Sequence, residues 1–130
     1  MILIDTSVWV DFLNNKSNVG VKKLEKLLND NQEICTTGII ITEVLQGIGK
    51  DKEYLRTKSI ILELPYLPIK EKQTFLHASE IYRSCRKAGI TVRKTIDCLI
   101  AAIAIENDVL LLTNDKDFSG IAKNTSLKLH

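Results

Sequence analysis

The sequence is poor in the residues that mark several familiar kinds of site. It contains two histidines and three cysteines, and no C-x-x-C pair. Cys35, Cys85 and Cys98 are widely and irregularly spaced, so neither a zinc site nor a disulfide framework is indicated. Each cysteine has apolar neighbours, among which a free cysteine behaves as a small hydrophobic side chain. We therefore expect a cytoplasmic protein in a reducing environment.

Long apolar runs and a strong charge bias are also missing. The longest apolar run, residues 98–105, is far shorter than a membrane-spanning helix requires. Asp5 interrupts the N-terminal apolar stretch and no basic segment precedes it, so we expect no signal peptide. The net charge is only +2, so any binding of nucleic acid must depend on local basic patches.

The remaining composition is that of an ordinary globular protein. The 130 residues are 45% hydrophobic and 26% charged, and they show no repeat, low-complexity tract or linker. We expect residues 1–130 to form a single domain around one core.

The apolar pattern predicts strands that alternate with helices. Strands are expected at residues 1–4, 33–37 and 109–113, and a last one near 126–129 after a polar segment at 114–120. Helices are expected at 7–14, 19–29, 39–48, 51–63, 70–87 and 96–107. Both prolines lie in residues 64–69, which suits an extended edge segment, and Gly89 suits the left-handed position after a helix. This order is typical of an α/β fold with a mainly parallel, twisted sheet flanked by helices.

Helical spacing also predicts the buried faces of the helices. The helix at 96–107 is apolar on nearly every side and should be buried. The inner faces expected for the helices at 19–29, 51–63 and 70–87 are, in turn, Val21, Leu24, Leu27 and Leu28; Tyr54, Leu55, Ile61 and Leu62; and Phe75, Ser79, Tyr82 and Cys85 or Arg86.

Acidic side chains recur where the expected strands end and helices begin. Asp5 ends the first strand, Asp115 lies two residues beyond the strand at 109–113, and Asp97 begins the apolar helix. Glu43 lies in the helix after the second strand, among apolar neighbours. Parallel strands have their carboxyl ends at one edge of the sheet. We therefore expect the three aspartates to lie together, with Glu43 about one helical turn further in.

Most of these acids also have a purely structural explanation. Asp5 could be a helix N-cap, Asp97 could complement a helix dipole, and Asp115 with Asp117 could form a turn. Glu43 is harder to explain in this way, because an unpaired carboxylate in apolar surroundings is costly.

A bound cation would explain all four acids together. Clustered carboxylates either share protons or bind a hard cation such as Mg²⁺ or Mn²⁺. Such a site can activate water for attack on a phosphodiester. Neither His77, in the middle of a helix, nor the terminal His130 is a convincing ligand or base.

Three segments carry a resemblance to a known family. LIDTSVWVDFL, ITEVLQGI and IDCLIAAIAIENDVLLLTNDKDF resemble the motif blocks of PIN-domain nucleases, in particular the VapC-type toxins of prokaryotic toxin–antitoxin pairs. The resemblance extends over essentially the whole chain. It implies a three-layer α/β/α PIN-like fold and an Mg²⁺- or Mn²⁺-dependent endoribonuclease, usually dimeric. It also implies a cognate antitoxin that inhibits the enzyme and alone brings it to operator DNA, and it implies no membrane.

The resemblance also assigns roles to residues. It implies that Asp5, Glu43, Asp97 and Asp115 are catalytic. Within that set, Asp5 and Asp97 are expected to ligate the metal directly, and Glu43 and Asp115 to hold metal-bound waters or a second ion. Thr6 and Asn114 are expected to orient the carboxylates by hydrogen bonds. Further polar residues around the last acid are Thr113 and Asp117.

A basic segment just before Asp97 is the candidate RNA-binding surface. A phosphate-binding rim is needed beside an acidic centre, which by itself repels RNA. A solvated helix end that complements the helix dipole explains the same charges equally well. Trp9 and Phe12 are expected in the core, with a dimer interface as the alternative. The basic candidates are Arg83, Arg86, Lys87, Arg93 and Lys94.

Other functional classes fit less well. An aspartyl-phosphate phosphatase needs a second aspartate two residues after the first, where this chain has Ser7. A receiver domain needs an acidic pair near the first strand and a lysine after a late strand, and this chain has neither in the expected place. A non-catalytic or regulatory PIN-like module that binds metal or RNA remains as the alternative.

Overall fold

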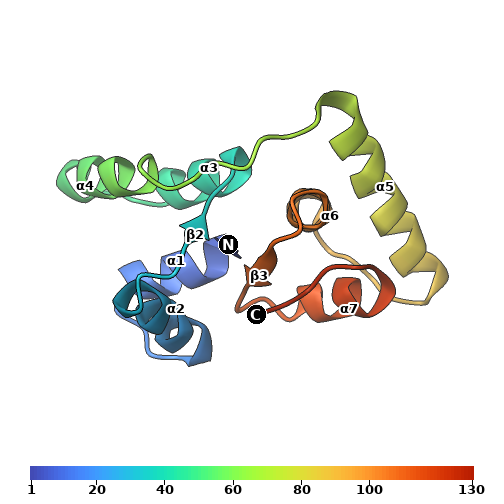
Figure 1. The fold of residues 1–130 in the computed structure, drawn as a ribbon, viewed down its shortest axis with the longest axis horizontal. Helices are drawn as coiled ribbons and strands as arrows, with labels where there is room; N and C mark the ends of the chain where they lie inside the picture. Colours follow the sequence, from blue (N-terminus) through green and yellow to red (C-terminus); the bar gives the residue numbers. More distant parts are fainter.

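Three short parallel strands lie at the centre of the fold. In the computed structural model, which describes residues 1–130, β1 (Ile2–Ile4) lies between β2 (Ile34–Cys35) and β3 (Leu110–Leu112) (Figure 1). Leu3 pairs with Cys35 on one side and with Leu111 on the other. The helices are α1 (Thr6–Leu13), α2 (Val19–Asn29), α3 (Gly38–Gln46), α4 (Asp51–Ile61), α5 (Glu71–Lys87), α6 (Thr95–Glu106) and α7 (Asp117–Asn124).

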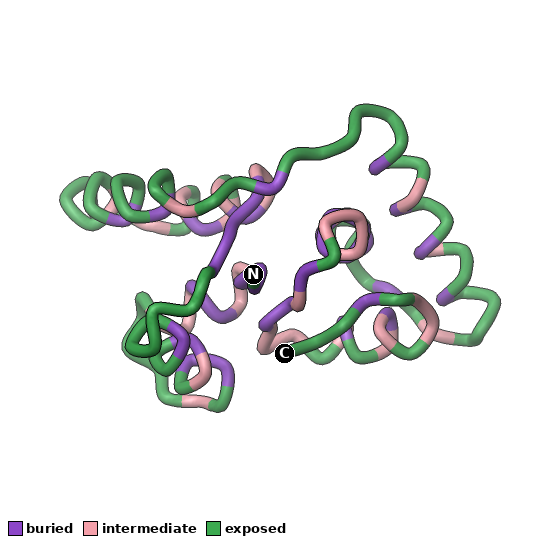
Figure 2. Tube along the Cα trace, in the orientation of Figure 1, coloured by how far each residue is buried: buried purple, intermediate pink, exposed green.

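The helices cover the sheet on both sides and enclose one core. In Figure 1, α1 to α4 lie toward the β2 end of the sheet, and α5, α6 and α7 lie toward the β3 end. The tube in Figure 2 shows the strands and α6 as the most continuously buried parts of the chain. α6 contributes an unbroken buried stretch from Ile100 to Ala104, as its apolar sequence predicts. All three cysteines are free and buried. No helix has the length and apolar character needed to cross a bilayer.

Two short segments extend the sheet at its edges. Beyond β2, the Thr36 N–H donates to the Pro65 carbonyl (2.9 Å) and the Leu67 N–H donates to the Thr36 carbonyl (2.8 Å). The proline-containing segment is therefore an extended edge, as predicted. Beyond β3, the expected last strand is reduced to a single bridge between Leu111 and Leu129.

The segment after β3 corrects the sequence-based prediction. The sequence pattern predicts a polar connection at residues 114–120, whereas Asp117 begins the helix α7. Phe118 and Ile121, three residues apart, are fully buried on its inner face. The Asp115 carboxylate accepts a hydrogen bond from the Asp117 N–H (2.9 Å), which helps α7 to begin there.

Two predicted helix faces are also wrong in detail. On α4, Leu55 and Leu62 are 62% and 58% exposed, so only Ile61 of the four expected residues is buried. On α5 the buried stripe begins one residue before Phe75, which is 52% exposed. Small and medium side chains on this stripe let α5 pack closely on α6. The buried residues of α5 are Thr74, Ala78, Ile81 and Cys85.

At the ends of α2 and α5, one sequence-based prediction is wrong and one is confirmed. Leu28 of α2 is 42% exposed, unlike Val21, Leu24 and Leu27, which are buried. Gly89 adopts a φ of 77° directly after the end of α5, as predicted for a left-handed C-terminal residue.

Candidate active site

Asp5 lies where β1 ends and α1 begins. Its Oδ2 accepts hydrogen bonds from the Ser7 N–H (3.2 Å), the Ser7 hydroxyl (2.5 Å) and the Thr113 hydroxyl (3.0 Å). The side chain is therefore the N-cap of α1, and it is buried. Capping occupies Oδ2 alone and leaves Oδ1 available. The structural and functional explanations of Asp5 are thus compatible.

Asp97 is the second buried acid of the site. It lies in the first turn of α6, is 4% exposed, and its Oδ2 is buried without a hydrogen-bond partner. Carboxylate oxygens of Asp97, Asp115 and Asp117 all lie within 4.8 Å of one another. Burial is the main cause that raises the pKa of Asp97 to about 6, and the negative charges of Asp115, Asp5 and Asp117 act in the same direction. Lys94 opposes the shift.

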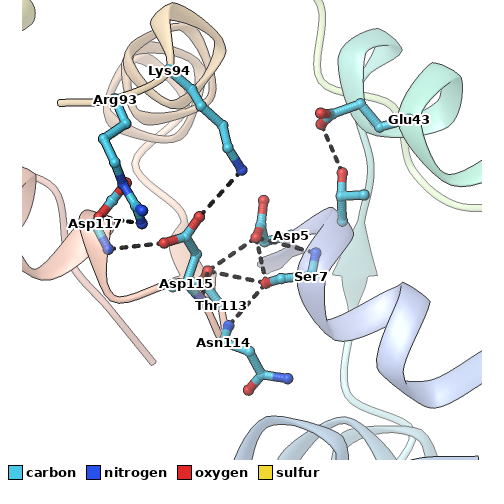
Figure 3. Close-up of polar contacts among 10 residues, drawn as sticks. Asp5, Ser7, Glu43, Arg93, Lys94, Thr113, Asn114, Asp115 and Asp117 are labelled. Atoms are coloured by element: carbon cyan, nitrogen blue, oxygen red, sulfur yellow. Dashed lines mark hydrogen bonds and ion pairs between the residues drawn. The ribbon is translucent and has the colours of Figure 1, made fainter.

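Glu43 faces this group from α3. Figure 3 shows Asp5 between Glu43 and Asp115. The Thr6 hydroxyl donates to Glu43 Oε1 (2.8 Å), a contact that can orient this carboxylate. Glu43 forms no ion pair, and its bond to Thr6 is partly buried.

Two basic side chains reach the acids from the segment between α5 and α6 (Figure 3). The Arg93 guanidinium binds Asp117 through two hydrogen bonds of 2.9 and 3.2 Å. The Lys94 ammonium lies 3.7 Å from Asp115 Oδ2. Asp115 and Asp117 are therefore each paired with a cationic side chain. No basic group pairs with Asp97.

The other basic candidates lie further away on α5. Arg83, Arg86 and Lys87 are exposed and form no ion pair with the acids. The Arg86 guanidinium lies 5.8 Å from the centre of the Tyr82 ring. The basic segment is thus divided into a paired part at the acids and a free part at the end of α5.

Neither histidine belongs to the site. His77 Nδ1 lies 3.2 Å from Glu106 Oε1, at the end of α6 opposite Asp97, and His130 is terminal. Trp9 is only 5% exposed and belongs to the core, while Phe12 packs against it partly buried.

The Asn114 side chain contacts none of the four acids. Its amide donates instead to Asp11 Oδ2 (2.9 Å) and Asn18 Oδ1 (3.0 Å). Sequence reasoning missed Ser7, Asp11 and Asn18 as parts of this polar network. Ser7 follows a capping aspartate and Asn18 precedes a helix, and both are positions from which polar side chains bond to backbone. That signal is present in the sequence, but nothing in it indicates the contact with Asn114.

The donor set indicates what the site can bind. Its groups are carboxylate and hydroxyl oxygens, which are the ligands preferred by Mg²⁺ and Mn²⁺. Arg93 and Lys94 pair with Asp117 and Asp115, but the buried Asp97 Oδ2 has no partner, and such a group is costly to bury.

The chain is similar to known proteins over almost its whole length. The sequence profile of the PIN domain matches residues 2–124. The chain is 36% identical to VapC ribonuclease Mb1587 of Mycobacterium bovis over 129 residues, which are 98% of this chain and 96% of that protein. The structure of VapBC2 from Rickettsia felis, bound to a DNA fragment from its promoter, aligns with a TM-score of 0.70 and 25% identity. That alignment covers 100% of this chain and 98% of the other. VapBC-1 from nontypeable Haemophilus influenzae has the same fold, with a TM-score of 0.74, 22% identity, and coverage of 100% and 97%.

Proposed function

The chain belongs to the PIN-domain family, and on that premise we propose that it is a metal-dependent endoribonuclease and the toxin of a toxin–antitoxin pair. The observation that carries the proposal is the group of Asp97, Asp115 and Asp117, whose carboxylate oxygens lie within 4.8 Å of one another and include a buried Asp97 oxygen without a hydrogen-bond partner. Asp5 lies close enough for its charge to act on Asp97 in the same direction as those of Asp115 and Asp117. We take residues 1–130 as one PIN-like nuclease domain.

The residues present fit a divalent cation. We assign Asp5 and Asp97 as its direct ligands, with Asp115 and Glu43 as acids that orient water around it. The free Oδ1 of Asp5 and the orphaned Oδ2 of Asp97 support this assignment. When bound, Mg²⁺ or Mn²⁺ supplies positive charge that activates water and offsets charge developing on a phosphodiester.

Other side chains of the protein are proposed to accept a proton and to attract the RNA. Thr6 holds Glu43 through Oε1, so Oε2 is free to accept a proton from an attacking water. Arg93 and Lys94 lie at the rim of the acids, where their cationic groups can attract RNA phosphates. Arg83, Arg86 and Lys87 extend this attraction along α5.

The antitoxin belongs to the same proposal, because solved structures of this fold include VapBC complexes. An apolar cavity of about 240 Å³ between α1 and α4 provides a candidate docking surface. Ile60 and Leu28 are exposed at its wall, and Lys16, Lys22 and Arg56 lie at the neighbouring surface. The surface suits a segment with apolar side chains and flanking acids. Any contact with operator DNA then passes through the antitoxin.

We also propose a cytoplasmic homodimer. Phe75 and Leu76 of α5 are 52% and 62% exposed, next to a cavity of about 310 Å³ that reaches Leu99 of α6. A second copy that covers this apolar surface would explain the exposure. Light scattering of the purified chain measures this directly, since the proposal requires twice the 14.6 kDa of the monomer.

Cleavage by the purified chain tests the enzymatic proposal. Free of antitoxin, the protein should cut single-stranded or loop RNA in Mg²⁺ or Mn²⁺, and EDTA should stop the reaction. Asp97→Asn should lose most of the activity while remaining folded. Undiminished cleavage in EDTA would contradict the metal mechanism, and RNA binding without cleavage in either metal would indicate the non-catalytic alternative.

A further inference from the structure

Asn114 is anchored at a distance from the acids by its side chain. The amide nitrogen donates to Asp11 Oδ2 of α1 (2.9 Å) and to Asn18 Oδ1 (3.0 Å) at the start of α2. Asn18 also donates to Asp11 Oδ2 (2.8 Å) and caps α2 by accepting from the Val21 N–H (3.0 Å). Three segments separated in sequence are therefore joined at one amide. Figure 3 shows the Asn114 side chain directed away from Asp5 and Asp115.

The backbone of the same residue points the other way, toward the active site. The Asn114 N–H donates to the Ser7 hydroxyl (3.0 Å), and that hydroxyl donates to Asp5 Oδ2. The hydroxyl of the preceding residue, Thr113, also donates to Asp5 Oδ2, and it accepts a hydrogen bond from the Asp115 N–H (3.0 Å). In the chain, Asn114 thus lies between Thr113, which helps to hold Asp5, and the acid Asp115.

Gly20 makes the position of the amide possible. A Cβ on this buried residue of α2 would overlap Asn114 Oδ1 and lie 2.6 Å from Asn114 Cγ. Gly20 is the second residue of α2, and the space that its missing side chain leaves is filled by the Asn114 side chain.

We propose that Asn114, held in place by Asp11, Asn18 and the space above Gly20, is a positioning residue that sets the distance between Asp5 and Asp115. The inference rests on the proposed metal-dependent function. The backbone after β3 carries Asp115, and through Ser7 and Thr113 it also holds Asp5. Anchoring this backbone at Asn114 therefore fixes both carboxylates. Groups that orient ligands in this way typically contribute about 10- to 100-fold to metal affinity or activity.

Two different substitutions test the proposal. Asn114→Ala removes the anchor, and Gly20→Ala leaves every polar group present but displaces the amide. Each should weaken Mn²⁺ binding about tenfold, measured by calorimetric titration of the purified protein. In cleavage assays, each should lower kcat more than it raises KM, because the acids and not the basic rim are disturbed.

The double variant separates positioning from general stability. With Asn114 truncated, the added methyl at Gly20 meets no amide, so the double variant should bind Mn²⁺ no more weakly than Asn114→Ala alone. Asn107→Ala is the matched control, since it removes a similar amide hydrogen bond (2.8 Å to the Ile103 carbonyl) at the far end of α6. It should lower the melting temperature without changing Mn²⁺ affinity.

The outcomes distinguish this inference from the function on which it rests. If wild type binds Mn²⁺, Asp97→Asn does not, and both Asn114→Ala and Gly20→Ala bind it like wild type, the positioning role is wrong and the metal site stands. If the two losses add in the double variant, the anchor and the glycine act independently, which also contradicts the proposal. A wild type that binds no Mn²⁺ overturns the proposed function itself.

Discussion

Asp97 has the least favourable electrostatic environment of the acids in the site. It is buried, it faces other carboxylates, and its Oδ2 has no protein partner. Asp5 is equally buried, but three hydrogen bonds to Oδ2 satisfy it. Two aspartates at one edge of the sheet thus have different chemical environments, because only one has hydroxyl and N–H groups beside it.

The first prediction concerns Asp97→Asn. Without metal, the variant should melt no lower than wild type, because asparagine keeps the shape and removes a buried, repelled charge. Mg²⁺ at about 100 times its dissociation constant should stabilise wild type by about 2.7 kcal/mol and the variant much less. Melting curves in EDTA and in Mg²⁺ measure both effects. Equal Mg²⁺ shifts in the two proteins would show that Asp97 is only a helix-end charge.

The second prediction concerns pH. The pKa of Asp97 is raised from 3.8 to about 6, so the folded state binds more protons than the unfolded state between these values. The free energy of unfolding of metal-free protein should therefore fall as pH rises from about 4 to 6, by on the order of 2 kcal/mol from this group. Urea unfolding across this range checks it. Asp97→Asn should show a shallower decline, and an identical decline in both proteins would assign the effect to other groups.

At the scale of the elements, α5 and the segment after it carry the two parts of the basic surface. Arg93 and Lys94 are engaged with Asp117 and Asp115, whereas Arg86 and Lys87 in the last turn of α5 are free of acids. The free cations are therefore the better test of phosphate binding, since substituting them leaves the acidic cluster intact.

The third prediction follows from this division. Arg86→Ala combined with Lys87→Ala should weaken RNA binding and reduce the slope of log affinity against log salt by about one unit for each phosphate that the protein no longer binds. Mn²⁺ binding should be nearly unchanged. Fluorescence titrations of labelled RNA at several salt concentrations measure the slope. If affinity and slope both match wild type, the free basic residues only complement the helix dipole at the end of α5.

The elements also show how far the sequence alone can predict this structure. The positions of Asp5, Glu43, Asp97 and Asp115 are predictable because they follow from where strands end and apolar helices begin, which is local information. The helix α7 is not, because its polar start conceals two buried residues, Phe118 and Ile121, in a short segment.

Other features depend on packing between elements. The buried stripe of α5 meets the predicted one at Cys85 but lies one residue earlier elsewhere, because the small residues Thr74 and Ala78 pack on α6 where the pattern predicts Phe75 and Ser79. The partners of Asn114 and of Lys94 are not predictable, because those interactions join segments far apart in the chain.

At the scale of the whole molecule, the acidic site and the proposed antitoxin surface are built on the same helix. α1 begins at the Asp5 cap and carries Trp9 and Phe12 on the wall of the apolar cavity toward α4. A partner docked in that cavity would therefore contact the element that directly follows a proposed metal ligand.

The fourth prediction tests that surface. Ile60→Glu should weaken capture of the cognate antitoxin by tenfold or more, because it places a charge in an apolar interface, while RNA cleavage by the free chain should be unchanged. Leu55→Glu is the matched control, on the same helix and 62% exposed but outside the cavity. Co-purification and titration with the antitoxin measure the effect. Equal affinity for both variants would place the antitoxin elsewhere.

Mapping RNA ends in cells tests whether the chain cleaves RNA through its carboxylates. Wild type and Asp5→Asn are induced in turn without antitoxin, and new 5′ ends in total RNA are sequenced. Asparagine caps a helix about as well as aspartate, so the variant keeps the fold and loses only the charge. We expect new ends at a small number of loop or single-stranded positions with wild type and none with Asp5→Asn. The same ends in both proteins, or new ends in neither, would contradict a carboxylate-dependent endoribonuclease.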